Sequence, residues 1–340
     1  MKNILAFETS CDETAVALLR FTKNSRFNNF QYYHSLHSQT DIHSQFGGVV
    51  PELASRDHIR KIKPLAQNVL QQANLNWNDI DYFAYTAGPG LAGALMVAGG
   101  FTQALATSIQ KPVIPIHHLE GHLLSPLLAK SPPQFPYIAL LISGGHSQIY
   151  KVIKPKKYEL LGESVDDAAG EAFDKSAKLL GLTYPGGQHL EKLAAKYSKP
   201  KASKKLPRPM INSKNLNMSF SGLKTAVWHW VSKSKIEDYP EIAFEFQNAI
   251  TEVLISKALS AINKSGINNL AVCGGVARNR FLFNAFMKQA KNKKVNLFFT
   301  PFEYCTDNAV MIALAASFYL EQAKKSDGSF KICPHWQLSS

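Results

Sequence analysis

Residues 4–19 read ILAFETSCDETAVALL, and residues 138–153 read IALLISGGHSQIYKVI. Each stretch is an apolar run, a short turn that contains Ser, Thr, Gly or Asp, and a second apolar run, which is the pattern of a β-hairpin. A hairpin of this kind in each half of the chain indicates two copies of one structural unit. We therefore predict a duplicated architecture with two lobes.

Helical patterns follow the strands in both halves. The stretch NLAVCGGVARNRFLFNAFMKQA predicts a strand at 270–273, a turn at its two glycines and a helix that starts near Ala277. Residues 307–325 predict a last helix, which is capped at Thr306 or Asp307. Strands that alternate with helices predict an α/β fold with mixed sheets.

The composition is that of a soluble globular chain. It has 340 residues, of which 45% are hydrophobic and 19% are charged, so a large core in two lobes is expected. The four cysteines form no C-x-x-C pair and the first residues predict a strand instead of a secretion signal, so we expect reduced thiols and a cytoplasmic protein. Residues 83–110 carry no charge, but their Gly-Pro-Gly turn and polar side chains favour a buried helix over a membrane span.

The net charge is basic, and part of it is concentrated. The formal net charge is +13, and residues 196–214 hold seven Lys or Arg and no acid. Smaller clusters lie near Lys154–Lys157 and Lys288–Lys294. Such segments are usually solubilising loops, but the local concentration together with the global excess favours nucleic acid as a partner. We predict that segment 196–214 contacts nucleic-acid phosphates.

Two histidines in the run IHHLEGHLLSP are placed to bind a metal. His118 and His122 have the i, i+4 spacing that puts both imidazoles on one face of a helix. Histidine is the commonest metal ligand, and Asp307 is a candidate for the third ligand. Two histidines and one carboxylate bind non-haem iron, with zinc as the main competitor. The alternative is a pair of polar side chains on a solvated helix face.

The histidine pair must be distinguished from the site of a zinc peptidase. The peptidase motif is H-E-x-x-H, in which the acid next to the first His is the general base. Here Glu120 stands one position later, and one residue turns a helical side chain by about 100°. Glu120 would point away from a water between the histidines, so the peptidase base is missing.

Two glycine turns between strands and helices favour phosphate binding. The runs SGG at 143–145 and GG at 274–275 would leave backbone N–H groups free to hold phosphate. Neither is a P-loop or a dinucleotide-binding motif, and one such turn alone is usually only structural. Together with the acidic hairpin turn at Asp12 and Glu13, they resemble the actin, sugar kinase and heat-shock ATPase superfamily, in which a nucleotide lies between duplicated lobes.

This resemblance implies an α/β, duplicated two-lobed actin-like ATPase fold. We assign residues 1–112 to the first lobe, with the helix near 307–325 packing back on it. Residues 113–306 form the second lobe, which would carry the metal and nucleotide motifs. In that lobe, Asp174 is either a carboxylate that accepts from ribose hydroxyls or one member of a surface pair with Lys178.

A series of motifs resembles one known family. The motifs are FETSCDET, GGVVPELASRDHIR, AYTAGPGL, HHLEGHLLSP, LISGGHSQ, GESVDDAAGEAFDKSAKLLGL with YPGG, FSGLKT, CGGVARNR and CTDNAVMIA. In this order they resemble the tRNA N6-adenosine threonylcarbamoyltransferase family, once labelled O-sialoglycoprotein endopeptidase, from about residue 4 to about residue 320. The length and the lack of a fused kinase resemble the bacterial catalytic subunit.

The resemblance implies roles for particular residues. It assigns one transition metal ion, Fe(2+) before Zn(2+), to His118, His122 and Asp307. It also assigns contacts with an adenine nucleotide, threonylcarbamoyl-AMP or ATP, to a larger set in the second lobe. These residues are Leu141, Ile142, Ser143, Gly144, Gly145, Asp174, Gly187 and Asn279.

The family reaction moves a threonylcarbamoyl group from its AMP mixed anhydride to N6 of adenosine 37, in tRNAs that read codons beginning with A. The partners that the resemblance implies are tRNA, a non-catalytic paralogue and a small ATPase, with a separate enzyme that makes the adenylate and no membrane. We expect the paralogue to dock on the apolar segments around 48–60 and 83–105.

Two other functions and the general base stay open at this point. The alternatives are a metal-dependent peptidase and a non-catalytic ATP-binding scaffold, although a scaffold has no need of a complete His-His-Asp set. No general base can be named from the residues alone. Asp12 and Glu13 are candidates, and they could equally orient water on the metal, or magnesium.

Overall fold

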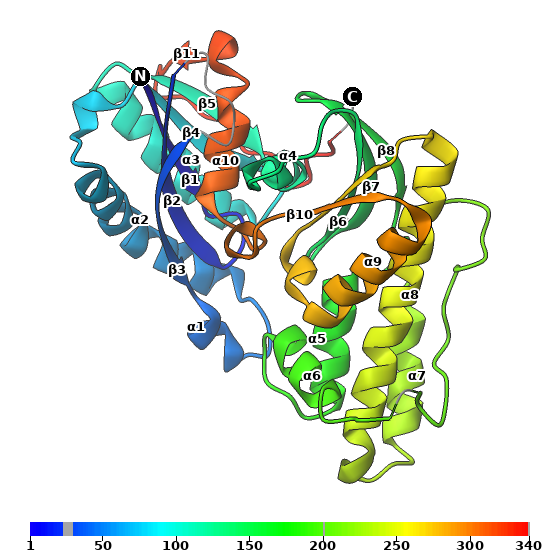
Figure 1. Ribbon diagram of the computed structural model, residues 1–340. Coiled ribbons are helices and arrows are strands. Elements are labelled where there is room, and N and C mark those ends of the chain that lie inside the picture. Colours follow the sequence, from blue (N-terminus) through cyan, green and yellow to red (C-terminus); the bar gives the residue numbers. More distant parts are fainter. Residues whose placement is uncertain (23–29, 200, 339–340) are drawn as a thin grey trace. The chain divides into compact units, whose positions relative to one another are not determined.

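The chain folds into two compact units (Figure 1). The computed structural model describes residues 1–22, 30–199 and 201–338. The first unit is Met1–Pro132 together with the residues from Thr306 onward, and the second unit is Pro133–Cys305.

The division between the units differs from the one expected from the sequence. The expected boundary followed residue 112, whereas the first unit extends to Pro132. The reason is that strand β5 (Pro112–His117) pairs in parallel with β4 and so belongs to the first sheet. The two histidines of the predicted metal site, which follow β5, therefore lie in the first unit and not in the second.

The sheet of the first unit has the strand order β11-β5-β4-β1-β2-β3. Its strands are β1 (Lys2–Glu8), β2 (Glu13–Phe21), β3 (Gln31–Ser38), β4 (Tyr82–Gly88), β5 (Pro112–His117) and β11 (Lys324–Lys325). The first three strands are antiparallel, and β4 and β5 continue the sheet in parallel on the other side of β1. The hairpin predicted at 4–19 is confirmed, because Ile4 of β1 pairs with Leu19 of β2.

Helices cover both faces of this sheet. They are α1 (Thr40–Ser44), α2 (Pro51–Ala73), α3 (Ala92–Ser108), α4 (His118–Leu124) and α10 (Ala309–Ser317). Leu5 and Phe7 of β1 belong to a core that includes α2 and α3. Successive strand residues point to opposite faces, so Ile4 and Ala6 face the other side, where α10 packs on β1 and β2. Helix α10 also contacts α4, so it connects the sheet with the predicted metal-binding helix.

The sheet of the second unit has the strand order β10-β9-β6-β7-β8. Its strands are β6 (Tyr137–Ile142), β7 (Ser147–Lys154), β8 (Lys157–Glu163), β9 (Asn269–Cys273) and β10 (Asn296–Phe299). The first three are antiparallel, and β9 and β10 run parallel to β6 on its other side. The predicted hairpin at 138–153 is confirmed, with Ile138 opposite Lys151.

The two sheets share one connectivity. In each unit a three-stranded antiparallel meander comes first, and the next two strands add in parallel to its first strand. Strands β1 to β5 therefore correspond in order to β6 to β10. The duplication predicted from the two hairpins is present at the level of the whole sheet.

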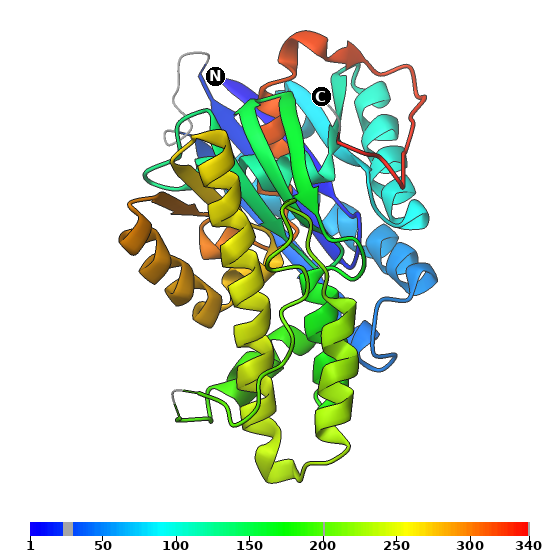
Figure 2. The same cartoon turned by 90° about the vertical axis from the view of Figure 1, so that its right-hand side faces the viewer.

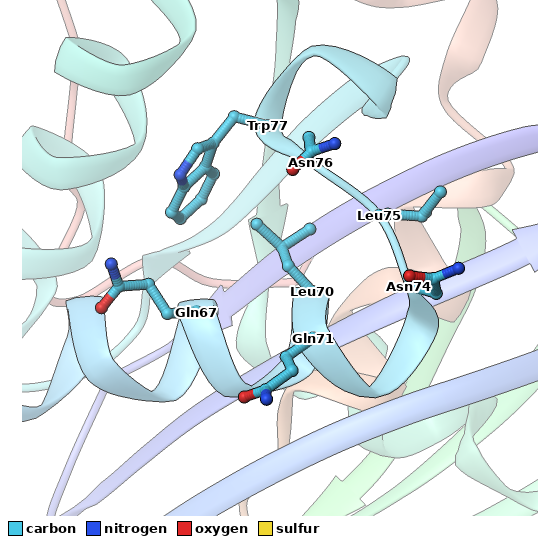
Figure 3. A pocket seen from close by; sticks show the side chains of 7 residues that line it. All are labelled: Gln67, Leu70, Gln71, Asn74, Leu75, Asn76 and Trp77. Carbon is cyan, nitrogen blue, oxygen red and sulfur yellow. The ribbon is translucent and has the colours of Figure 1, made fainter.

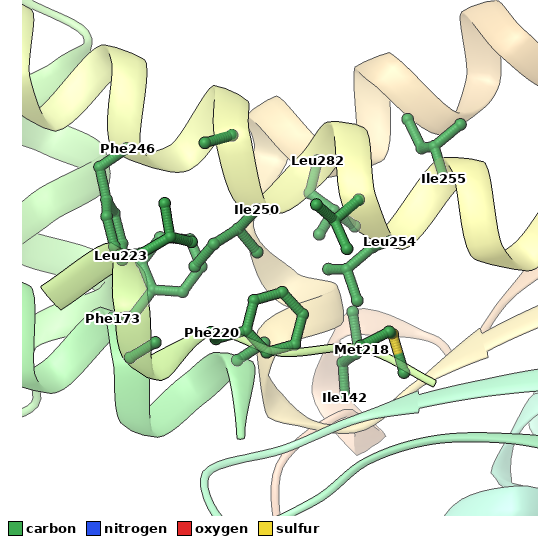
Figure 4. Packing of buried hydrophobic residues seen from close by; sticks show 14 of the residues in the cluster. Ile142, Phe173, Met218, Phe220, Leu223, Phe246, Ile250, Leu254, Ile255 and Leu282 are labelled. Carbon is green, nitrogen blue, oxygen red and sulfur yellow. The ribbon is translucent and has the colours of Figure 1, made fainter. Parts of the chain in front are cut away.

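The core of the second unit lies between one face of its sheet and a layer of helices. These are α5 (Ala169–Leu179), α6 (Gly186–Ala194), α7 (Ser221–Val231), α8 (Tyr239–Ser265) and α9 (Arg280–Lys293). Figure 4 shows Phe246, Ile250 and Leu254 of α8 above Phe173 of α5 and Ile142 of β6, all in one buried cluster. The long α8 also packs along α7, as Figure 2 shows.

Two helices differ in their bounds from the sequence prediction. Helix α9 begins at Arg280 because residues 275–278 form a 3-10 turn first. Helix α10 ends at Ser317, and the chain then returns to the sheet as β11, which pairs with β5. The uncharged stretch at 83–110 forms strand β4 and helix α3, and among the described residues no helix is long and apolar enough to cross a bilayer.

Candidate metal and substrate sites

Helix α4 presents both predicted metal-binding histidines. His118 is its first residue and His122 follows one turn later, with 4.8 Å between the ring centroids. Both side chains are buried, so they are not polar residues of a solvated face. The helical spacing predicted from the sequence is confirmed.

Asp307 reaches the histidines from the start of α10. Gly121 of α4 allows this approach, because a Cβ there would lie 3.0 Å from side-chain atoms of Met311 and Ile312. The sequence left open that Asp307 only caps this helix, but the N-cap is Asn308, whose side chain accepts from the backbone N–H of Met311. The Asp307 carboxylate is thus available to the histidines.

Three donor atoms converge in the first unit. The Oδ1 atom of Asp307 lies 3.0 Å from Nε2 of His122 and 3.5 Å from Nε2 of His118. One ligand atom from each of the three residues lies within 4.8 Å of the others. Two imidazole nitrogens and one carboxylate oxygen form a donor set that suits iron or zinc.

Glu8, at the end of β1, holds the first histidine in place. Its Oε2 atom lies 3.0 Å from Nδ1 of His118, so that nitrogen carries the hydrogen and Nε2 faces Asp307. The same carboxylate accepts from the Thr86 hydroxyl and from the Ser10 backbone N–H, each at 2.6 Å. This is the carboxylate–histidine arrangement that commonly orients metal ligands. Glu8 was not among the residues predicted from the sequence, although a carboxylate close after the apolar run ILAF was a usable signal.

The electrostatics of this cluster favour a cation. Burial alone would raise the pKa of Asp307, but His118 and His122 hold it below its ordinary value through charge and hydrogen bonds. Burial would lower the pKa of His118, yet the carboxylates of Asp307 and Glu8 raise it well above its ordinary value. A buried site with two carboxylates therefore stabilises positive charge between them.

The second histidine also fits a metal site. Nδ1 of His122 is buried and has no hydrogen-bond partner among the residues that the structure describes. Its other ring nitrogen, Nε2, faces the carboxylate of Asp307. We conclude that His118, His122 and Asp307 fit a bound transition metal.

Glu120 does not take part in the cluster. It is buried, and both of its carboxylate oxygens accept from the Tyr319 hydroxyl, at 3.0 and 2.8 Å. Burial and this neighbouring charge raise the pKa of Tyr319. The acid that a peptidase would use as its base is thus held by a tyrosine.

The acidic hairpin turn belongs to the same unit as the metal cluster. Asp12 is buried, and its backbone carbonyl accepts from the Gln39 N–H at 3.0 Å. Burial and the charges of Asp307 and Asp12 raise the pKa of Glu13 well above its ordinary value. The nearby charges of Asp307 and Asp12 keep Glu13 a candidate in acid–base chemistry.

The glycine turns of the second unit are neighbours. They follow the parallel strands β6 and β9, and a Cβ on Gly274 would lie 2.4 Å from the Ile142 carbonyl oxygen. Gly274 also has a φ of +92°, a conformation that favours glycine. Helix α5 approaches the first turn equally closely, since a Cβ on Gly170 would lie 2.5 Å from the Ser143 oxygen. Both turns thus meet near the start of α5.

Three glycines predicted to contact substrate have an open backbone, which means that no neighbouring atoms cover the Cα atom on its side-chain face. A Cβ on Gly144, Gly145 or Gly187 would meet no atom within 4 Å. Asp174, one turn into α5, accepts from the backbone N–H of Gly186 at 2.7 Å, which fixes the chain beside Gly187. The alternative pair with Lys178 is not the contact that the structure shows for this carboxylate.

Three further residues predicted to contact substrate have side chains that the fold itself uses. The side chains of Leu141 and Ile142 are fully buried in β6, so only their backbone is available to a ligand. Asn279 is the N-cap of α9, and its Oδ1 accepts from the Leu282 N–H at 2.8 Å. A capping role accounts for this asparagine without a ligand.

The basic segment is attached to α8. The predicted segment 196–214 contains residue 200, which lies outside the described residues. The Tyr197 hydroxyl donates to Glu241 at 3.0 Å, and the Leu206 N–H donates to Glu245 at 3.0 Å. Arg208 pairs with Glu245 and Glu252.

This attachment divides the cations of the segment into two groups. Arg208 neutralises acids of α8, and its contact with phosphate stays a prediction. Lys201, Lys204 and Lys205 are exposed, and they remain available to an anionic partner.

A separate pocket lies at the C-terminal end of α2. Gln67, Asn74 and Trp77 are among the residues that line it, and Figure 3 shows their side chains around its mouth. None of the predicted site residues contributes to this pocket. Neither the metal cluster nor the glycine turns depend on it.

Sequence comparisons identify close relatives. A family model described as tRNA N6-adenosine threonylcarbamoyltransferase (TsaD) matches residues 32–314. A protein of that name from Methylobacillus flagellatus is 49% identical over 340 residues, which cover 99% of this chain and 98% of the relative. A protein of the same name from Neisseria meningitidis is 49% identical over 357 residues, with the same two shares.

Structure comparisons show the fold. Full-length HypF matches 94% of this chain and 47% of its own with a TM-score of 0.61 at 13% identity. Component A of (R)-2-hydroxyglutaryl-CoA dehydratase from Acidaminococcus fermentans matches 93% of this chain and 100% of its own with a TM-score of 0.55 at 16% identity. The predicted duplicated actin-like ATPase fold is confirmed by these neighbours.

Proposed function

The chain belongs to the tRNA N6-adenosine threonylcarbamoyltransferase family, and we propose that it moves the threonylcarbamoyl group of threonylcarbamoyl-AMP to N6 of adenosine 37 in tRNAs reading codons that begin with A. The observation that carries this proposal is the convergence of His118, His122 and Asp307 in one buried cluster. A non-catalytic scaffold would have no use for such a cluster.

The reaction requires activation of the carbonyl carbon and stabilisation of the leaving group. Adenine N6 is a poor nucleophile because its lone pair is delocalised into the ring. A bound metal, Fe(2+) before Zn(2+), supplies Lewis-acid polarisation and a template for the reacting groups. His118, His122 and Asp307 would hold it, while Glu8 keeps Nε2 of His118 directed at the site.

The second unit supplies the adenylate site in this proposal. The open backbone at Gly144 and Gly145 binds the AMP phosphate through N–H groups near the start of α5. Asp174 holds Gly186, and the open backbone of Gly187 beside it contacts the ribose end. Holding both ends of the nucleotide positions the mixed anhydride, and positioning is a large part of catalysis for such a transfer.

The peptidase alternative receives no support from the first unit. A metallopeptidase needs a carboxylate as general base beside the metal. Glu120 is the acid between the histidines, and its two carboxylate oxygens share the hydrogen of the Tyr319 hydroxyl instead.

We propose a cytoplasmic reaction with protein partners, a non-catalytic paralogue and a small ATPase. Ile59 and Met96 lie in the two segments expected to dock the paralogue, and their side chains are 63% and 55% exposed. Exposed apolar side chains on adjacent helices suit a protein interface. The helices that carry them, α2 and α3, pack against each other.

A reconstitution tests the function together with the need for partners. The purified chain with threonylcarbamoyl-AMP and tRNA alone should give at most a single turnover, and the paralogue and the ATPase should raise it to many. Nucleoside analysis of the tRNA measures the product. No modified adenosine in the complete mixture would refute the transferase, whereas many turnovers by the chain alone would refute only the need for partners.

The exposed lysines of the basic segment should bind tRNA phosphates. Changing Lys201, Lys204 and Lys205 together to Gln should weaken tRNA binding and flatten its salt dependence by about 2–3 slope units, at roughly 0.7–0.9 per lost contact. Filter binding at several salt concentrations measures both effects. Adenylate binding should stay unchanged.

Arg208 of the same segment provides a control for the triple lysine variant. Because it pairs with Glu245 and Glu252, its change to Gln should lower stability and leave the salt slope unaltered. An unchanged slope in the triple lysine variant would show that the tRNA path lies elsewhere, over Lys154–Lys157 or Lys288–Lys294.

A further inference from the structure

A segment near the C-terminal end lies across the first unit. The Lys331 carbonyl accepts from the Tyr85 hydroxyl at 3.2 Å, and the Cys333 N–H donates to the Ala87 carbonyl at 2.7 Å. The Phe330 ring lies against α3, where a Cβ on Gly99 would be 2.6 Å from it. We call residues 326–336 the strap. It lies beyond residue 314, where the match to the family model ends.

The strap fits closely onto the turn after β4. A Cβ on Gly88 would lie 2.0 Å from the Cys333 carbonyl oxygen, so only glycine allows this approach of the two backbones. The next contact follows directly, because the Gly90 N–H donates to the Pro334 carbonyl at 3.1 Å. These contacts fix the path of the strap up to Trp336.

Trp336 then contacts the residue before the first metal ligand. Its backbone carbonyl lies 3.2 Å from Nε2 of His117, and the two rings are 4.8 Å apart between centroids. A carbonyl oxygen can only accept, so Nε2 of His117 carries the ring hydrogen. The other ring nitrogen, Nδ1, is then an acceptor.

The acceptor nitrogen of His117 caps the metal-binding helix. His117 is the N-cap of α4, and its Nδ1 accepts from the Leu119 N–H at 3.1 Å. Helix α4 has seven residues, and a helix so short is not stable without its caps and its packing. The opposite tautomer would place a hydrogen against the Leu119 N–H and remove the cap.

We propose that His117 is a positioning residue for the metal site, and that the strap acts through it by fixing its tautomer. Three contacts carry this effect. The Trp336 carbonyl favours the hydrogen on Nε2 of His117, and Nδ1 of the same ring then caps α4. The capped first turn sets the direction of the His118 side chain. This inference rests on the proposed metal-binding role of His118, His122 and Asp307.

The test uses full-length variants and Co(2+) as the probe, since its visible absorption reports ligand geometry. His117→Phe keeps a ring beside Trp336 but loses both hydrogen bonds, and should weaken Co(2+) binding by about 10–100-fold, the usual effect of losing a residue that orients a ligand. His117→Asn should recover most of the affinity and the wild-type spectrum, because asparagine caps a helix by itself.

A double variant separates tautomer control from ring packing. Trp336→Ala keeps the backbone carbonyl but removes the ring contact that holds it against His117. It should weaken Co(2+) binding in the wild-type background and add little to the loss in His117→Phe, which keeps a ring but has no tautomer to fix. Equal losses in both backgrounds would overturn the role of the strap, and wild-type affinity and spectrum in His117→Phe would overturn the role of His117. A wild-type chain that binds no Co(2+) would instead refute the metal site itself.

Discussion

The double variant His118→Ala, His122→Ala should contain no metal and show no threonylcarbamoyl transfer. Two of the three converging donor atoms are removed, and loss of a ligand costs more than the roughly 10–100-fold in affinity that loss of an orienting neighbour costs. Elemental analysis of the purified protein measures the metal, and nucleoside analysis of tRNA measures the transfer. Full metal occupancy in the double variant would rule out this site.

This experiment needs controls because the loss of His118 also removes a contact of Glu8. Without His118, the Glu8 carboxylate stays fully buried and loses its contact with the imidazole, so the double variant should also be less stable than the wild type. Asp307→Asn avoids this loss of stability because it leaves the Glu8–His118 contact intact, and it should lose metal with the fold retained. His34→Ala with His37→Ala removes two imidazoles from β3 of the same unit and should keep the metal.

The sequence was sufficient to predict the duplication because a hairpin pattern is local. Alternating apolar runs and short turns identified one hairpin in each half, and both exist with the expected pairing. No local sequence pattern indicates to which unit β5 belongs. Its assignment to the first unit depends on pairing with β4, so the boundary drawn at residue 112 could not be corrected from the sequence.

The metal site was predictable to the extent that it follows a helical spacing. His118 and His122 are one turn apart on a single helix, and this required only the residue order. The choice between ligand and cap at residues 307 and 308 did not follow from the sequence, because Asp and Asn both favour N-caps. The structure separates them, with Asn308 bonded to Met311 and Asp307 directed at the histidines.

The contacts that support the ligands were the least predictable part. Glu8 is separated from His118 by more than a hundred residues in the chain and meets it only through the packing of β1 near α4. The same holds for Tyr319, which holds Glu120, and for Arg208, which pairs with α8 although nearby lysines of the same segment are exposed. Such partners depend on tertiary packing and leave no spacing pattern.

Gly145→Val should abolish nucleotide binding while metal binding continues. A Cβ at this position meets no atom within 4 Å and the φ angle is not left-handed, so the change should alter stability by no more than about 0.5 kcal/mol. The valine methyl groups would fill the space in which the proposed phosphate meets the backbone N–H groups. Two lost hydrogen bonds to a charged group, at roughly 1.5–3 kcal/mol each, correspond to at least about a 100-fold loss of affinity for AMP.

Gly222→Val is the matched control for this variant. Gly222 lies on α7 of the same unit, and a Cβ there also meets no atom within 4 Å, but it is not part of either glycine turn. It should therefore bind AMP as the wild type does in a calorimetric titration. Wild-type AMP affinity in Gly145→Val would show that the turn after β6 does not hold the phosphate. Loss of Co(2+) binding in the same variant would show instead that the change disturbs more than the adenylate site, because the metal ligands belong to the other unit.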